Sequence, residues 1–61
     1  MIKKGDRFLK VDGVDNDRVV EVEILEVSPS GKYVKYDVLG GTLRWNTMED
    51  FIAWKTLEAL K

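Results

Sequence analysis

The chain contains neither cysteine nor histidine. Without cysteine it can form no disulfide and no thiolate zinc site, and without histidine no Ser–His or Cys–His catalytic pair is available. The only serines, Ser28 and Ser30, flank a proline whose context indicates a turn. The carboxylates Glu21 and Glu23 alternate with valines, as expected of the solvated face of a strand rather than of an acid–base pair. The sequence therefore predicts a protein that is not an enzyme and that needs no cofactor or metal.

An excess of charge of one sign is also lacking. Ten Lys and Arg residues stand against eleven Asp and Glu residues, which leaves a net charge of −1. The overall basic character of many nucleic-acid binders is thus missing, although a local basic patch remains open. No apolar run has the length to span a membrane, and no apolar segment follows the N-terminal lysines as in a signal peptide. We expect a complete cytoplasmic protein with one domain, residues 1–61.

A hairpin is the strongest local signal in the chain. Residues 19–27 and 33–39 are rich in β-branched and aromatic residues at alternate positions, as in half-buried strands. Between them, Pro29 presets φ for the first turn position and Gly31 can adopt a left-handed conformation. The apolar alternation of the first run changes phase between Ile24 and Leu25, which predicts a β-bulge or a sharp bend there.

Shorter strands are expected on both sides of this hairpin. Residues 7–11 form a first strand, and the turn-forming residues 12–17 follow it. That acidic segment resembles a calcium loop only superficially, because the EF-hand spacing of acids and glycine is absent, so a plain turn is predicted. After the turn Gly40-Gly41, residues 42–45 form a fourth strand, with Leu43 and Trp45 facing inward and Thr42 and Arg44 facing outward.

The C-terminal segment has the pattern of a helix over residues 48–60. Thr47 is placed to cap its first turn, with Asp50 three residues later as in a capping box. At about 100° per residue the apolar side chains form two stripes rather than one. Either the helix is held deeply in the core with some exposed leucines, or its second face contacts another chain. That second stripe contains Ala53, Trp54, Leu57 and Leu60.

These elements predict a small α+β fold, in which a strongly bent antiparallel sheet is capped by one C-terminal helix. The expected core combines the inward-facing strand residues with the first helical stripe. It comprises Phe8, Val20, Val22, Ile24, Val34, Tyr36, Val38, Leu43, Trp45, Phe51 and Ile52.

The opening Lys4-Gly5-Asp6-Arg7-Phe8-Leu9-Lys10-Val11-Asp12-Gly13, followed by a long valine-rich strand, resembles the start of small SH3-like barrels of the KOW and Tudor type. In those families Gly-Asp precedes the first strand and a glycine follows it. The layout of a bent second strand, a tight hairpin and a terminal helix also resembles the small archaeal chromatin proteins. The resemblance implies an SH3-like partial barrel, and nucleic-acid binding as its usual role.

The leading hypothesis for function is a non-enzymatic binding module that acts through protein–protein contact. The partner is either another protein or a second copy in a homodimer, and the role is that of a phage or prokaryotic accessory or regulatory protein. Trp54 is the expected anchor, because Trp is enriched at interface hot spots. The predicted interface residues are Trp54, Leu57, Leu60 and Ala53.

Nucleic-acid binding on the outer sheet face is the alternative hypothesis. Such a site interleaves basic side chains with aromatic ones. Glu21, Glu23 and Asp37 would border the same surface and repel phosphates. The residues predicted for this site are Tyr33, Lys35, Arg44 and Lys10.

Overall fold

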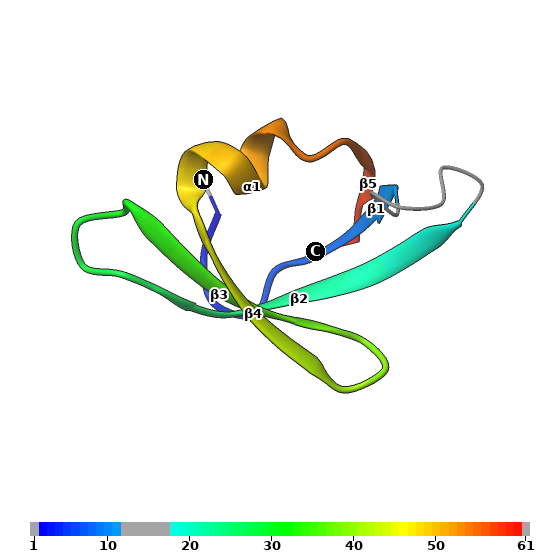
Figure 1. Cartoon of the computed structure of the whole chain (residues 1–61), viewed down its shortest axis with the longest axis horizontal. Helices are drawn as coiled ribbons and strands as arrows, with labels where there is room; N and C mark the ends of the chain where they lie inside the picture. The colour runs from blue at the N-terminus through cyan, green and yellow to red at the C-terminus, as the bar shows by residue number, and fades with distance from the viewer. Residues whose placement is uncertain (1, 12–17, 61) are drawn as a thin grey trace.

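Five antiparallel strands form one sheet with the order β4-β3-β2-β1-β5 in the computed structural model, which describes residues 2–11 and 18–60 (Figure 1). The fold is thus mostly β with one helix, as predicted, but the helix is short and the sheet is not closed into a barrel. The turn predicted for residues 12–17, with its calcium-loop alternative, lies outside the described residues. The elements are β1 (Arg7–Val11), β2 (Val19–Val27), β3 (Tyr33–Val38), β4 (Thr42–Thr47), α1 (Met48–Ala53) and β5 (Thr56–Ala59).

The β2–β3 hairpin confirms the turn predicted from proline and glycine. Gly31 has φ of 76°, and its N–H donates a 2.9 Å hydrogen bond to the carbonyl of Ser28. The predicted irregularity in β2 is also confirmed, because the pairing with β3 shifts between Ile24 and Glu26 and leaves Leu25 as the extra residue. A bulge of this kind bends the strand and increases its twist.

The core lies between one face of the sheet, here called the inner face, and α1. Its inner-face members come from β2 and β3, and Phe51 of α1 covers them. The ring centre of Phe51 is 5.1 Å from that of Tyr36 and 6.0 Å from that of Phe8. Aromatic rings at such separations stabilise a core beyond the area they bury. The fully buried apolar residues are Val22, Ile24, Val34, Tyr36 and Phe51.

The predicted helix over residues 48–60 is wrong in its second half. Its start is confirmed, since the Thr47 hydroxyl accepts a hydrogen bond from the N–H of Asp50 at 3.1 Å. The helix ends at Ala53, Trp54 is extended, and residues 56–59 form β5 beside β1. A six-residue helix gains little from its own hydrogen bonds. The N–H and C=O groups on the open edge of β1 can form additional hydrogen bonds with the end of the chain. Hydrogen bonds between Val11 and Lys55 and between Leu60 and Arg7 flank the β5 pairing.

Three predicted core residues lie at the surface instead. Leu43, Trp45 and Ile52 are 60%, 55% and 63% exposed. Trp45 pairs with Lys35, so the two side chains share the outer face of the sheet, opposite the face that holds Tyr36. Ile52 is exposed because the short helix turns only one narrow side, that of Phe51, toward the sheet.

Candidate functional site

The backbone of β4 has one side that no strand among the described residues covers, because β4 is the end strand of the sheet. The N–H of Met48 donates to the carbonyl of Lys32 at 2.7 Å. Hydrogen bonding alternates along an antiparallel pair, so Arg44 and Asn46 bond to β3 in the same way. The N–H and C=O groups of the intervening residues therefore point to the open side. Those residues are Leu43, Trp45 and Thr47.

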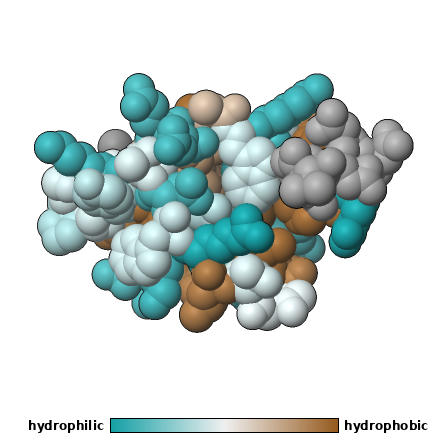
Figure 2. All heavy atoms as spheres, in the orientation of Figure 1, coloured by the Kyte–Doolittle hydropathy of each residue, from teal (hydrophilic) through white to brown (hydrophobic). Residues whose placement is uncertain are grey.

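Apolar side chains of the same region are exposed on the outer face. Tyr33 is 52% exposed, and the Nζ atom of Lys35 lies 5.7 Å from the ring centre of Trp45. Figure 2 shows hydrophobic surface at the lower edge of the view, where the β3–β4 hairpin lies. We call this region the β4 edge surface. It comprises the open backbone edge of β4 and the outer-face side chains of Tyr33, Leu43 and Trp45.

The two end strands of the sheet differ in how they are protected. Soluble proteins usually protect end strands by keeping them short, by bulges, by proline or by charged side chains. β5 has four residues and its pairing with β1 shifts between Leu9 and Lys10. β4 has six residues in unbroken register with β3, contains no proline, and carries Arg44 as its one charged residue. β4 is thus the end strand that another chain can extend.

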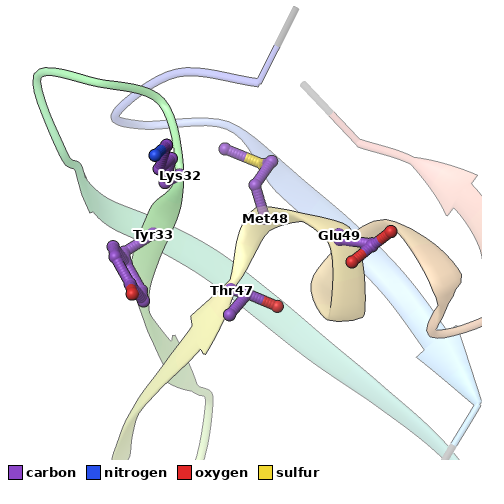
Figure 3. A pocket seen from close by; sticks show the side chains of 5 residues that line it. All are labelled: Lys32, Tyr33, Thr47, Met48 and Glu49. Atoms are coloured by element: carbon purple, nitrogen blue, oxygen red, sulfur yellow. The ribbon is translucent and has the colours of Figure 1, made fainter.

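A shallow depression of about 270 Å³ lies at the end of this surface, where β4 continues directly into α1 (Figure 3). Its walls come from the residue before β3, the first residue of β3, the end of β4 and the first turn of α1. The lining residues are Lys32, Tyr33, Thr47, Met48 and Glu49. Because Tyr33 belongs to both, the depression continues the β4 edge surface toward the helix.

The residues predicted as a protein interface do not lie on one helical stripe. Trp54 is partly buried, its ring centre is 5.8 Å from that of Tyr36, and its Nε1–H donates to the carbonyl of Val11. Leu57 is 51% exposed on β5, whereas Ala53 ends the helix. Leu60 follows β5 and is partly buried. The predicted common face is therefore wrong, and contact of these residues with a partner stays a prediction.

The residues predicted for nucleic-acid binding are likewise separated. Tyr33 and Lys35 share the outer face, as expected from their spacing in β3. Arg44 pairs with Tyr36 and therefore lies on the inner side of the sheet, so its predicted outward position is wrong. Lys10 is 1% exposed and cannot contact a phosphate group from inside the fold.

Lys10 instead caps the C-terminal end of α1 from the inner face of the sheet. Its ammonium group donates to the carbonyls of Phe51 and Trp54 at 3.0 and 2.9 Å and to the hydroxyl of Thr56 at 2.7 Å. The last carbonyls of a helix lack partners within the helix, and a cation near them is favourable. The Nζ atom also lies 4.1 Å from the ring centre of Phe51. The sequence contained one signal for this role: Lys10 shares its side of β1 with Phe8, a core residue.

Burial lowers the pKa of Lys10 from 10.5 to about 8, because all three acceptors of its ammonium group are neutral. Tyr36 shows the opposite shift: burial raises its pKa, and the positive charge of Arg44 works against that rise. Both groups lie on the inner face, and their shifted pKa values make the free energy of unfolding depend on pH in the alkaline range.

The stability of the protein is expected to change with pH in two opposite steps. Between pH 8 and 10.5 the unfolded chain holds a proton on Lys10 that the folded chain has released, so the free energy of unfolding rises with pH. The shift corresponds to about 3 kcal/mol. Above pH 10 the free energy falls again, since unfolded Tyr36 ionises first. Urea denaturation across this range checks both steps, and a flat profile between pH 8 and 10 would contradict the first.

No protein-family model matches this chain, and no curated protein or solved structure is significantly similar to it. Within residues 2–11 and 18–60, no group of three or more acidic side chains is arranged to hold a metal ion. No helix in that part of the chain is long and apolar enough to cross a membrane. The case for a function therefore rests on the geometry of the β4 edge surface.

Proposed function

We propose that the protein is a non-enzymatic binding module that acts through protein–protein contact, and that its binding site is the β4 edge surface. An extended segment of the partner adds to the sheet as a further strand beside β4. The observation that carries this proposal is the coincidence of two features at Leu43 and Trp45. Their backbone groups face the open edge, and their side chains are exposed on the outer face.

Strand addition suits these two features for a physical reason. The backbone hydrogen bonds of an added strand supply affinity, and pockets for its alternate side chains supply specificity. Trp45 and Tyr33 offer wide, rigid apolar surface that loses little conformational entropy on contact. Trp residues in such positions are often hot spots of binding. The partner segment is thus expected to be extended, with apolar residues at every second position.

The proposal predicts different effects for two substitutions at one residue. Leu43→Pro removes an N–H that points to the open edge, whereas Leu43→Ala keeps it and shortens the side chain. Peptides selected on the unchanged protein from a library of ten-residue segments are expected to lose at least tenfold more affinity with the proline variant than with the alanine variant, because only proline removes a ladder hydrogen bond. Fluorescence anisotropy measures the affinities, and circular dichroism verifies folding.

Two results would contradict this function. One is the absence of any selected peptide at a protein concentration at which the chain is a monomer, and the other is equal binding by the proline and alanine variants. The second result would show that the partner does not use the backbone of β4.

Nucleic-acid binding is the second candidate, because Tyr33, Lys35 and Trp45 share the outer face and form a platform on which bases can stack. Glu26 pairs with Lys35 on the same face and repels phosphates, which favours the protein partner. The same assay with single-stranded oligonucleotides at two salt concentrations separates the candidates. Salt-dependent binding that Trp45→Ala abolishes and Leu43→Pro retains would favour the nucleic acid.

An SH3-like module remains our proposal for the family. The bend of β2 at Leu25 and the short β2–β3 turn support it. The terminal helix of that layout is replaced by a short helix followed by β5. A protein-binding role is compatible with the resemblance, since function depends on the site rather than on the fold.

A further inference from the structure

We propose that the occupant of the β4 edge surface is a second copy of this chain. The two β4 strands pair antiparallel about a two-fold axis that passes beside Trp45. This inference rests on the proposed function and names its partner. The result is a continuous ten-stranded sheet, five strands from each copy, with the two β4 strands at its centre.

The alternation of hydrogen bonds limits how two copies of β4 can pair. Only Leu43, Trp45 and Thr47 turn their N–H and C=O groups to the open edge. Each of them that pairs within β4 must therefore meet one of the same three residues in the other copy. An axis at Arg44 or at Trp45 pairs five residues of β4, and an axis at any other residue pairs at most three.

Charge decides between the two remaining registers. An axis at Arg44 places this residue directly opposite its own copy, and like charges in that position destabilise a strand pair. An axis at Trp45 places Arg44 opposite Asn46 and Leu43 opposite Thr47. It also brings the two Trp45 residues into one cross-strand pair, and such aromatic pairs are stabilising.

The rest of the chain supports a copy of itself as the partner. Arg44 is the only charged residue of β4, so the preferred register contains no pair of like charges. The net charge of −1 on each copy causes little repulsion between them. The outer-face side chains of Tyr33, Leu43 and Trp45, each more than half exposed in one copy, then form a single apolar surface across the two-fold axis.

Sedimentation velocity at rising concentration gives the first test. The mass is expected to increase from 7.0 kDa to twice that value. Trp45→Lys and Trp45→Glu are each expected to remain monomeric, because each places like charges opposite each other at the axis. An equimolar mixture of the two variants is expected to restore the dimer, since the introduced lysine of one copy then faces the introduced glutamate of the other. Circular dichroism verifies that both variants are folded, as expected for a residue that is 55% exposed.

Because the chain has no cysteine, a single introduced cysteine can form a disulfide only with its equivalent in another copy. This gives a second test. In the proposed register Trp45→Cys faces its own copy at about 5.5 Å between Cα atoms, which a disulfide can bridge. Leu43→Cys lies four residues out of register, about 13 Å away along the strand, which a disulfide cannot bridge. Mild oxidation is expected to link the first variant as a dimer and leave the second, its matched control, unlinked.

The contrary outcomes are distinct. A mass of 7.0 kDa at every concentration, or equal cross-linking of both cysteine variants, would overturn the self-pairing. A mass larger than two copies would overturn it as well, because head-to-tail pairing of β4 with β5 builds rings or fibres. The proposed function would survive each of these results if Leu43→Pro still lowered peptide binding more than Leu43→Ala.

Discussion

Phe51→Ala is expected to lower the free energy of unfolding by about 3 to 5 kcal/mol, the usual cost of removing a buried aromatic ring. Phe51 is 1% exposed and touches the rings of Phe8, Tyr36 and Trp54. It is also the one buried residue of α1, so its loss removes the contact that holds the helix on the sheet. Thermal and urea denaturation followed by circular dichroism measure the change.

Ile52→Ala is the matched control, one residue further along the same helix. Ile52 is 63% exposed, so its truncation is expected to change the free energy of unfolding by less than about 0.5 kcal/mol. A domain of this size is stable by only about 3 to 9 kcal/mol. Phe51→Ala is therefore expected to remove at least about a third of that free energy. Equal stability of the two variants would show that α1 does not close the core.

Lys10→Met is expected to lower the free energy of unfolding by about 2 kcal/mol at pH 7. Methionine fills most of the space, but it leaves the carbonyl of Trp54 and the hydroxyl of Thr56 without a donor. The carbonyl of Phe51 keeps only the 3.3 Å hydrogen bond from the N–H of Trp54. Unpartnered acceptors in a buried site cost more than the burial of the ammonium group does. The loss is expected to be larger at pH 10, because the native protein gains stability there and the variant does not.

Lys35→Met serves as the control for this substitution, since it removes an amine from the outer face and not from the core. Its stability is expected to stay within about 0.5 kcal/mol of the unchanged protein, with the alkaline rise intact. If Lys10→Met were as stable as the unchanged protein at both pH values, the hydrogen bonds of Lys10 to the end of α1 would not stabilise the fold.

Local chemistry was enough to predict much of the sheet. Pro29 and Gly31 define a turn through their own backbone preferences. The phase change at Leu25 indicates a bulge because side chains alternate strictly along a strand. Thr47 caps the helix with its own hydroxyl, so its role can be predicted without knowledge of the rest of the fold. Each of these features depends on a few neighbouring residues.

The features that sequence reasoning missed depend on residues far apart in the chain. β5 forms because β1 has an open edge, which no pattern within residues 54–60 reveals. The side chains of Leu43 and Trp45 alternate as a core strand would, yet the register with β3 turns them outward. Lys10 is buried because neutral acceptors of Phe51, Trp54 and Thr56 converge on it.

The candidate site was affected by the same non-local features. The sequence predicts a protein-binding role from surplus apolar surface on a long helix, with Trp54 as its anchor. The short helix moves Trp54 against Tyr36 instead. The surplus apolar surface lies on β4, where the sequence pattern predicts that Trp45 belongs to the core.

The hydrogen bonds of the Lys10 amine also determine when the fold can be completed during synthesis. They join positions separated by 41, 44 and 46 residues along the chain. Closing such long loops before any contact is gained makes folding slow relative to helical bundles of similar length. Residue 56 must therefore leave the ribosome before Lys10 of β1 can make all three hydrogen bonds. Until then the nascent chain cannot complete its fold.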